Sequence, residues 1–306
     1  MNLSDFELLR TLPPWEYPPD AGLVICKVMT DKSSPLPDRV EAAQMAGEFT
    51  VINDDVAENL LQIVGDRTED ADLRSAAAIA FGPALEEAST NDPDEDEDMF
   101  GDPQAVTWPF IHKILAKLKE LHHDPAEPEL VRRRALEAAV RFPEDWHVLA
   151  IAAAAEQPGN QWRQTAAFCM RYCRGFEKEI LDYMKDSDAM VRMHAVQASG
   201  EWNIKEAWPE IEKILRREGP QTGDEKSILL AAIEASASVN PEEAGEVLDD
   251  WLHCEDEQIA DAASEALEAA ESGIWVDSDD DDDDDDDGDD DDEDEDGDKD
   301  DKSKRK

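Results

Sequence analysis

Basic residues are scarce in this chain of 306 residues. Lysine and arginine together number 29 against 78 aspartates and glutamates, which gives a formal net charge of -49. Such a chain would be repelled by a nucleic-acid duplex or an anionic membrane, whereas a basic protein surface would attract it. We therefore expect a protein partner with a basic surface, no direct contact with nucleic acid and no membrane association.

Cysteines and long apolar runs are also few. Four cysteines do not make a disulfide framework, and they lack the CxxC pairs of a zinc site. No stretch reaches the roughly 18 apolar residues that span a membrane, and no basic region leads into an apolar segment at the start of the chain. We expect a soluble, cytoplasmic protein without cofactors. Strand-forming residues never alternate in runs, which argues against a sheet.

The chain does contain a repeat that is built around arginine. Five segments align on one arginine each, and in all five an alanine follows three residues later. These arginines are Arg39, Arg74, Arg132, Arg163 and Arg192. Because positions three and four apart share a helix face, small alanines there allow a neighbouring helix to approach closely. The repeat predicts stacked helices.

A glycine follows three of the arginines by eight residues, at Gly47, Gly82 and Gly200. Glycine readily adopts the left-handed conformation that ends helices, so we expect these residues to separate each arginine helix from a second, apolar helix. Two second helices match closely, because residues 107–115 and 207–215 share Trp-Pro-x-Ile-x-Lys-Ile-Leu. Each repeat is then an arginine helix paired with the helix after it.

The spacing of the repeats sets the expected domain boundaries. We predict an extended N-terminal strap over residues 1–20 and a solenoid of about six to seven helix pairs over 21–276. The longest interval between arginines, 58 residues, contains an acidic loop at 89–104. Residues 277–306 carry a net charge of -16 and have nothing apolar to bury, so we expect a disordered tail.

The sequence resembles the HEAT-repeat superfamily, in particular the short bacterial HEAT-like repeats of the PBS-lyase type. Residues 188–202 (DAMVRMHAVQASGEW) and 71–82 (ADLRSAAAIAFG) carry the resemblance. It implies an all-α, right-handed α-solenoid that binds proteins on a concave face lined by the second helices. Related enzymes include deoxyhypusine hydroxylase, whose iron ligands are His-Glu dipeptides that this sequence lacks, and a branch that attaches bilin pigments. We expect no catalytic residues and no metal ligands.

Helix position and the resemblance together nominate residues for partner binding. Aromatic residues dominate binding hot spots when they face a groove, but a tryptophan at a repeat boundary can instead fill the gap between helix pairs. Acidic residues on the second helices and in the tail suit a basic partner. The candidates are Trp108, Trp146, Trp208, Glu210, Glu212, Asp279, Asp280 and Asp281.

The repeated arginines are expected to be structural, because a residue that returns at one position of every repeat serves the contact between neighbouring repeats. Aspartates that precede the arginine helices, such as Asp70 and Asp188, can cap these helices or pair with an arginine. Cys169 and Cys173 are a possible metal site with His194, but we expect them to pack as small apolar residues.

Two functions fit these features best. In the first, a non-enzymatic scaffold or adaptor holds a basic protein on its concave face, and the acidic tail speeds the encounter. In the second, the tail is itself the main ligand and shields a basic nucleic-acid-binding protein, as a chaperone would. An enzyme of the HEAT-like lyase or hydroxylase type is a third hypothesis. Solubility and adaptation to a salty cytoplasm are competing accounts of the tail, although nine successive aspartates concentrate charge more than surface adaptation requires. The sequence sets no oligomeric state.

Overall fold

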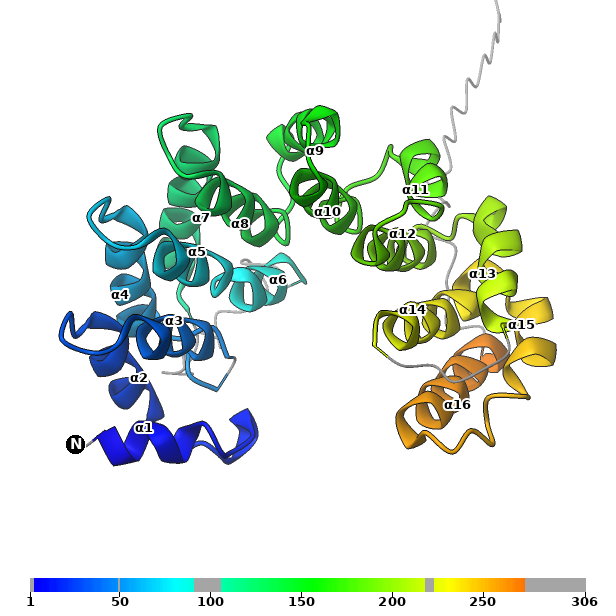
Figure 1. Ribbon diagram of the computed structural model, residues 1–306, viewed down its shortest axis with the longest axis horizontal. Helices are drawn as coiled ribbons and strands as arrows, with labels where there is room; N and C mark the ends of the chain where they lie inside the picture. The colour runs from blue at the N-terminus through cyan, green and yellow to red at the C-terminus, as the bar shows by residue number, and fades with distance from the viewer. Residues whose placement is uncertain (1–2, 49, 91–105, 218–222, 273–306) are drawn as a thin grey trace, which may run out of the picture.

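The chain folds into an arch of helices arranged in two layers (Figure 1). The computed structural model describes residues 3–48, 50–90, 106–217 and 223–272, and the regular structure in these ranges is entirely helical. Along the arch, an outer helix is followed by an inner helix seven times. The predicted all-α solenoid of six to seven helix pairs is therefore confirmed.

Each pair begins in the outer layer and ends in the inner layer. The outer helices are α2 (Ala21–Thr30), α4 (Asp54–Gly65), α7 (Trp108–His123), α9 (Trp146–Glu156), α11 (Glu177–Tyr183), α13 (Trp208–Leu215) and α15 (Pro241–Leu248). The inner helices are α3 (Leu36–Met45), α5 (Ala71–Ile79), α8 (Glu129–Ala139), α10 (Asn160–Cys169), α12 (Ala189–Glu201), α14 (Asp224–Val239) and α16 (Glu257–Ser272). Successive inner helices pack closely while outer helices splay apart, and this difference curves the stack.

The arginine helices lie in the inner layer, and the helices after them lie outside, except for the helix over residues 82–90 (Figure 1). Of its outer-layer neighbours, each arginine helix packs on the helix before it and not on the one after it, so the pairs differ by one helix from those expected. The expectation that second helices line the concave face is wrong. Inner helices occupy the shorter arc, where the alanines of the arginine helices permit close packing. The bulkier helices of the outer layer take the longer arc.

Residues before the first pair are more helical than expected. Residues 3–9 form α1 (Leu3–Leu9) and residues 14–16 form a 3-10 turn, η1 (Pro14–Glu16), where an extended strap was expected over 1–20. Phe6 and Leu9, three residues apart, share the buried face of α1 and cover the N-terminal end of the stack. This helix gives the first repeat a neighbour that its apolar surface needs.

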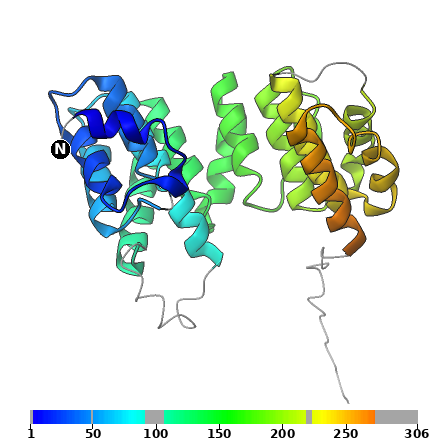
Figure 2. The same ribbon diagram turned by 90° about the horizontal axis from the view of Figure 1, so that it is seen from below.

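One further helix, α6 (Gly82–Thr90), lies on the inner side of the arch beside α8. It includes the first two residues of the loop expected at 89–104, whose remaining residues lie outside the described ranges, as does the tail expected at 277–306. Figure 2 shows that α6 and α16 end on the same edge of the arch. Both acidic segments are therefore attached to one edge of the solenoid.

The repeated arginines join the two helices of a pair. Arg39 Nε donates to the carbonyl oxygen of Met29 at 2.9 Å, and Arg74 Nε donates to that of Val64 at 3.0 Å. Arg132 makes the same bond to the carbonyl ten residues before it. Each acceptor lies in the last turn of an outer helix, where carbonyls have no partner within the helix. The guanidinium group therefore caps the outer helix.

Two of these arginines also reach the next repeat. Arg39 forms an ion pair with Glu69 at 2.9 Å, and Arg74 forms one with Glu127 at 2.7 Å. All four side chains are at most 9% exposed. A buried carboxylate that loses such a partner is left with its full desolvation cost. Each arginine thus ties three segments together.

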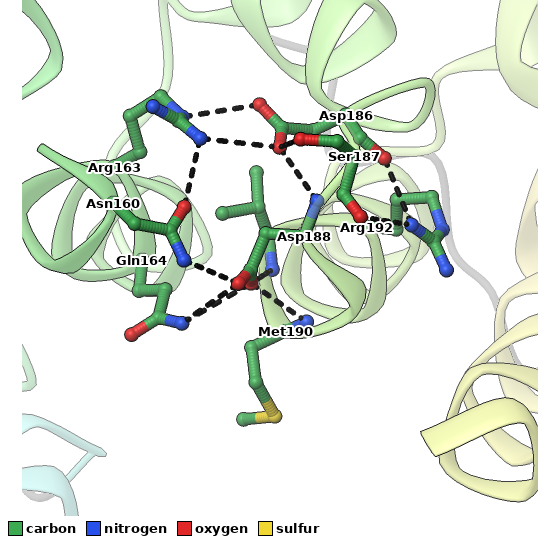
Figure 3. Close-up of polar contacts among 9 residues, drawn as sticks. Asn160, Arg163, Gln164, Asp186, Ser187, Asp188, Met190 and Arg192 are labelled. Carbon is green, nitrogen blue, oxygen red and sulfur yellow. Dashed lines mark hydrogen bonds and ion pairs between the residues drawn. The ribbon is translucent and has the colours of Figure 1, made fainter.

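The C-terminal repeats vary this arrangement (Figure 3). Arg163 pairs with Asp186 of the next turn at 3.1 Å, while Arg192 donates to the main-chain oxygen of Asp186 at 2.9 Å. Asp188 accepts from the first amides of α12 and from Gln164 on α10. Asp188 therefore caps one inner helix and ties it to the preceding one.

Close approach, and not helix termination, explains the recurring glycines. Gly47, Gly82 and Gly200 are absent from the residues with positive φ, and Gly200 lies within α12. A Cβ atom at Gly47 would lie 2.4 Å from the carbonyl oxygen of Ala80, and one at Gly200 would lie 2.9 Å from the Cα atom of Ala235. The expected left-handed role is wrong, because the backbone of the next repeat occupies the space that a side chain would need at Gly47 and Gly200, and the Arg141 side chain occupies it at Gly82.

Gly200→Ala should destabilise the protein by about 1–3 kcal/mol, because the added methyl group must displace the backbone of α14. Gly245→Ala, in α15, is the matched control, since its Cβ would meet only the Leu267 side chain at 3.5 Å. Alanine favours a helix by about 0.5–1 kcal/mol over glycine, so the control should be stabilised. Urea unfolding measures both changes, and effects of the same sign would contradict the close approach.

Arg74→Ala should lower the free energy of unfolding by about 2–3 kcal/mol, because buried Glu127 then keeps only the exposed Arg67 as a partner and the Val64 carbonyl loses its cap. Glu127→Gln in the same background should recover part of the loss, since a neutral amide costs less to bury. Arg163→Ala, at a half-buried position, should cost only about 1 kcal/mol or less. Equal losses for Arg74→Ala and Arg163→Ala in chemical denaturation would refute the tying role of Arg74.

Candidate functional site

The middle of the inner layer carries a cluster of aromatic and basic side chains, here called the inner-face cluster. Phe168 of α10 and Tyr172 are half-buried, with ring centroids 5.5 Å apart. The guanidinium of Arg141 lies 5.5 Å from the Phe168 centroid, and that of Arg171 lies 5.7 Å from the Tyr172 centroid. His194 of α12 meets Phe168 edge-on at 5.4 Å. Cation–π contacts hold the two rings in place.

Helix α6 joins this cluster through Glu86. Its carboxylate pairs with Arg141 at 2.6 Å and accepts a hydrogen bond from the Tyr172 hydroxyl at 3.4 Å. Burial raises the pKa of Tyr172, so its hydroxyl stays protonated and can donate. Glu86 therefore links three helical segments that are far apart in the sequence.

Three glutamates lie next to the cluster on successive inner helices, and they are here called the glutamate group: Glu201, Glu234 and Glu265. Partial burial raises the pKa of Glu234, the carboxylates of Glu201 and Glu265 raise it further, and Arg171 lowers it. Arg171 pairs with Glu201 at 3.2 Å. Arg171 thus lies near two carboxylates, those of Glu201 and Glu234, and Glu265 adds a third negative charge beside Glu234, which leaves an excess of negative charge.

A hollow of about 220 Å³ lies between α12 and α14 at this point. Arg171, Gln197, Glu201 and Glu234 line it together with small residues of the two helices. Because Gly200 lets α12 and α14 approach closely, the hollow is shallow and its polar groups stand at the surface. Such a surface suits a side chain of another protein better than it suits an enclosed small molecule.

The tryptophans nominated from the sequence lie in the outer layer, away from the inner-face cluster. Trp108 meets Phe142 edge-on at 6.3 Å. Trp208 is 8% exposed, and its indole N–H donates to Glu243 at 3.1 Å. Trp146 is half-buried and packs against the apolar cores of both halves of the arch. All three occupy boundaries between helix pairs.

The nominated glutamates also lie in the outer layer, on α13. Glu210 pairs with Lys213 at 3.3 Å and with Lys185 at 3.7 Å, and Glu212 pairs with Arg216 at 2.8 Å. These carboxylates are therefore compensated by their own neighbours. Outside the described residues lie Asp279, Asp280 and Asp281.

The inner-face cluster was missed at the level of sequence. Phe168 and Tyr172 are four residues apart on a helical repeat, and Arg171 lies between them, which is a pattern that binding surfaces favour. The arginine helices were assigned to the contact between repeats, so their remaining side chains received no role. Whether these side chains serve only the contact between repeats or also form a binding surface depends on the layer in which the helix lies.

A tryptophan and three histidines fill the seam between the α7–α8 pair and the α9–α10 pair. The ring of Trp146 lies 5.7 Å from His122, 5.1 Å from His123 and 3.9 Å from His147. Burial lowers the pKa of both His122 and His147 to about 4. The backbone N–H of Glu144 donates to Nδ1 of His147 at 2.8 Å, which a neutral ring accepts.

The thiols of Cys169 and Cys173 are buried in the core of the C-terminal half. Burial raises the pKa of Cys169 well above its ordinary value and that of Cys173 to about 11, so both are protonated at neutral pH. His194 is hydrogen-bonded to Gln197 instead. Within the described ranges, no three His, Cys, Asp or Glu side chains converge as metal ligands would, and no helix has the length and apolarity of a membrane span.

No family model matches the chain, and no curated protein matches its sequence. Similar solved structures include YibA of Escherichia coli, at 16% identity and a TM-score of 0.44, over 88% of this chain and 92% of YibA. Human deoxyhypusine hydroxylase is 15% identical with a TM-score of 0.37, over 83% and 97% of the two chains. An engineered protein is 17% identical with a TM-score of 0.37, over 84% and 99%. Values this low carry no information on activity or partners.

Acid should destabilise the fold through His122 and His147. Their pKa is lowered to about 4 in the fold, so the unfolded chain binds protons first as pH falls from about 6.5, and stability declines until about pH 4. His147→Gln removes one contribution, so its unfolding free energy should fall less steeply than that of the wild type over this window. Above pH 7.5 the two curves should run parallel, and parallel curves over the whole range would contradict a buried neutral His147.

Proposed function

We propose that this chain is a non-enzymatic scaffold that binds a basic segment of another protein on the inner face of its arch. The observation that carries the proposal is the glutamate group, in which three successive inner helices each expose one carboxylate and Glu234 lies between the charges of Glu201 and Glu265. Like charges held close together destabilise a fold unless a ligand compensates them. A lysine or arginine of a partner placed among Glu201, Glu234 and Glu265 would supply that compensation.

The inner-face cluster supports the same surface. Tyrosine and arginine are enriched among the residues that dominate binding energies, and half-buried rings lose little conformational freedom when a partner covers them. Phe168 and Tyr172 are already fixed by Arg141 and Arg171. The resemblance of the repeat to short bacterial HEAT-like proteins, which bind partners on concave faces, agrees with this assignment.

The acidic tail serves the encounter in this proposal. Residues 277–306 carry a net charge of -16, and the rest of the chain carries -33. Charges of one sign raise the rate at which an oppositely charged partner arrives, and salt weakens the effect. The four cysteines do not make a disulfide framework, which favours a cytoplasmic location.

A second candidate function is a chaperone-like shield in which the tail is the principal ligand of a basic nucleic-acid-binding protein. The observation that favours it is the run of nine aspartates at 279–287, which concentrates charge more than solubility requires. An enzyme of the HEAT-like lyase or hydroxylase type is a third hypothesis, and a metal or pigment found in the purified protein would support it.

The glutamate group can be tested by capturing partners from the source lysate with the full-length chain. Glu201→Gln/Glu234→Gln should reduce capture of the partner about tenfold, because two compensating charges are lost, while the melting temperature stays equal or rises. Glu179→Gln/Asp182→Asn on the outer helix α11 makes the same change in net charge and should leave capture unchanged.

A truncation after Val276 separates the two leading functions. A scaffold keeps its partner after truncation and in high-salt washes, whereas a shield loses it. Capture that survives both glutamate substitutions but fails on truncation would replace the scaffold by the shield. Equal losses for the inner and outer variants would show that only net charge matters.

A further inference from the structure

Helix α9, at the crest of the arch, is apolar on every side (Figure 1). Its sequence, WHVLAIAAAAE, contains one charged residue, Glu156. A helix of this composition is normally buried all round. Yet α9 packs chiefly on α10, toward which it directs one row of residues, namely His147, Ala150, Ile151 and Ala154.

The opposite side of α9 is an exposed apolar surface, here called the crest face. It consists of Val148, Leu149, Ala152 and Ala153, which share one side of the helix because their spacing is one, four and five residues. Val148 is 45% exposed and Leu149 is 76% exposed. Adjacent exposed apolar side chains are a candidate interaction site, whereas single exposed leucines are ordinary.

The two neighbouring outer helices differ from α9 because they expose charged side chains. Helix α7 exposes Lys113, which pairs with Glu58, and Lys119, whose ammonium lies 5.4 Å from the Trp146 centroid, and α11 exposes Glu179 and Asp182. Charged side chains keep an outer helix of a solenoid soluble, as expected for a surface that meets only water. The crest face lacks them in a chain whose charged residues make up 35% of the sequence.

Charge at the two ends of the crest face indicates what can cover it. Exposed Glu144 and Asp145 precede α9 and exposed Glu156 ends it, so carboxylates stand about 18 Å apart at a rise of 1.5 Å per residue. A second copy of this chain laid antiparallel would bring Glu144 and Asp145 against Glu156 and be repelled. A helix with basic residues at both ends would be attracted.

We propose that the crest face binds one amphipathic helix of a partner protein, three to four turns long, with an apolar stripe between basic ends. Ala152 and Ala153 leave room for the partner backbone to approach, and Leu149 inserts between its side chains. This surface lies on the opposite side of the helix layers from the glutamate group. The scaffold therefore has two separate docking sites, one concave for a basic segment and one convex for a helix.

The probe for this site is a fluorescein-labelled helical peptide of about 18 residues with a leucine–alanine stripe and lysines at both ends. A permuted peptide of the same composition has no stripe, so it reports attraction by net charge alone, including that of the tail. A third peptide carries glutamates in place of the lysines. Fluorescence anisotropy with the full-length protein at near-physiological salt measures each affinity.

The stripe peptide should bind at least about tenfold more tightly than either other peptide. Leu149→Gln/Ala153→Gln should abolish that difference, because both substitutions place polar groups in the centre of the crest face. Leu23→Gln is the matched control, since Leu23 is a leucine 66% exposed on another outer helix, α2. It should change nothing, and neither should Glu201→Gln/Glu234→Gln. Circular dichroism confirms that each variant keeps its helices, and Ala152→Gln alone is a second, milder variant of the crest face.

Three results would overturn the proposal. Equal affinity of the permuted peptide and the stripe peptide would leave only non-specific attraction. Binding of the stripe peptide that is absent, or indifferent to Leu149→Gln/Ala153→Gln, would show that the crest face is not its site. Sedimentation that reveals a dimer dissolved by the same double variant would assign the crest face to a second copy of the chain.

Discussion

The arch depends on a guanidinium group that does three things at once. It caps the open end of an outer helix, holds the inner helix to which it belongs, and neutralises a carboxylate of the next repeat. Arg39 and Arg74 do all three. Because the three tasks meet in one buried side chain, the angle between repeats is set by a few short contacts, and every surface of the solenoid takes its place from that angle.

Much of the fold was predictable because it follows from residue spacings within each repeat of the sequence. The arginine-to-alanine spacing gave the helices and their stacking, and the composition indicated the absence of strands. The layer of each helix was not predictable, since Ala42 and Ala195 reveal a close contact but not which neighbour makes it. Gly200 was misread for the same reason: its spacing is local, whereas the backbone of Ala235 that requires it comes from the next repeat.

The candidate site was less accessible to sequence than the fold. Glu201, Glu234 and Glu265 lie more than thirty residues apart in succession, so only the register between repeats brings their charges together. Trp208, in contrast, is of a residue type that is common in binding hot spots, but the structure places its ring at a boundary between helix pairs. Binding surfaces of solenoids arise between repeats, and a sequence read one repeat at a time does not contain that relation.

The contacts at the glycines oppose tightening of the arch but not its opening. Tightening the curve would press inner helices together where Gly47 already meets Ala80 and Gly200 already meets Ala235 without room for a methyl group. Opening the curve causes no such clash, because the outer helices are splayed and would only move closer together. The solenoid thus has a fixed minimum radius, and its curve has more freedom to open than to tighten.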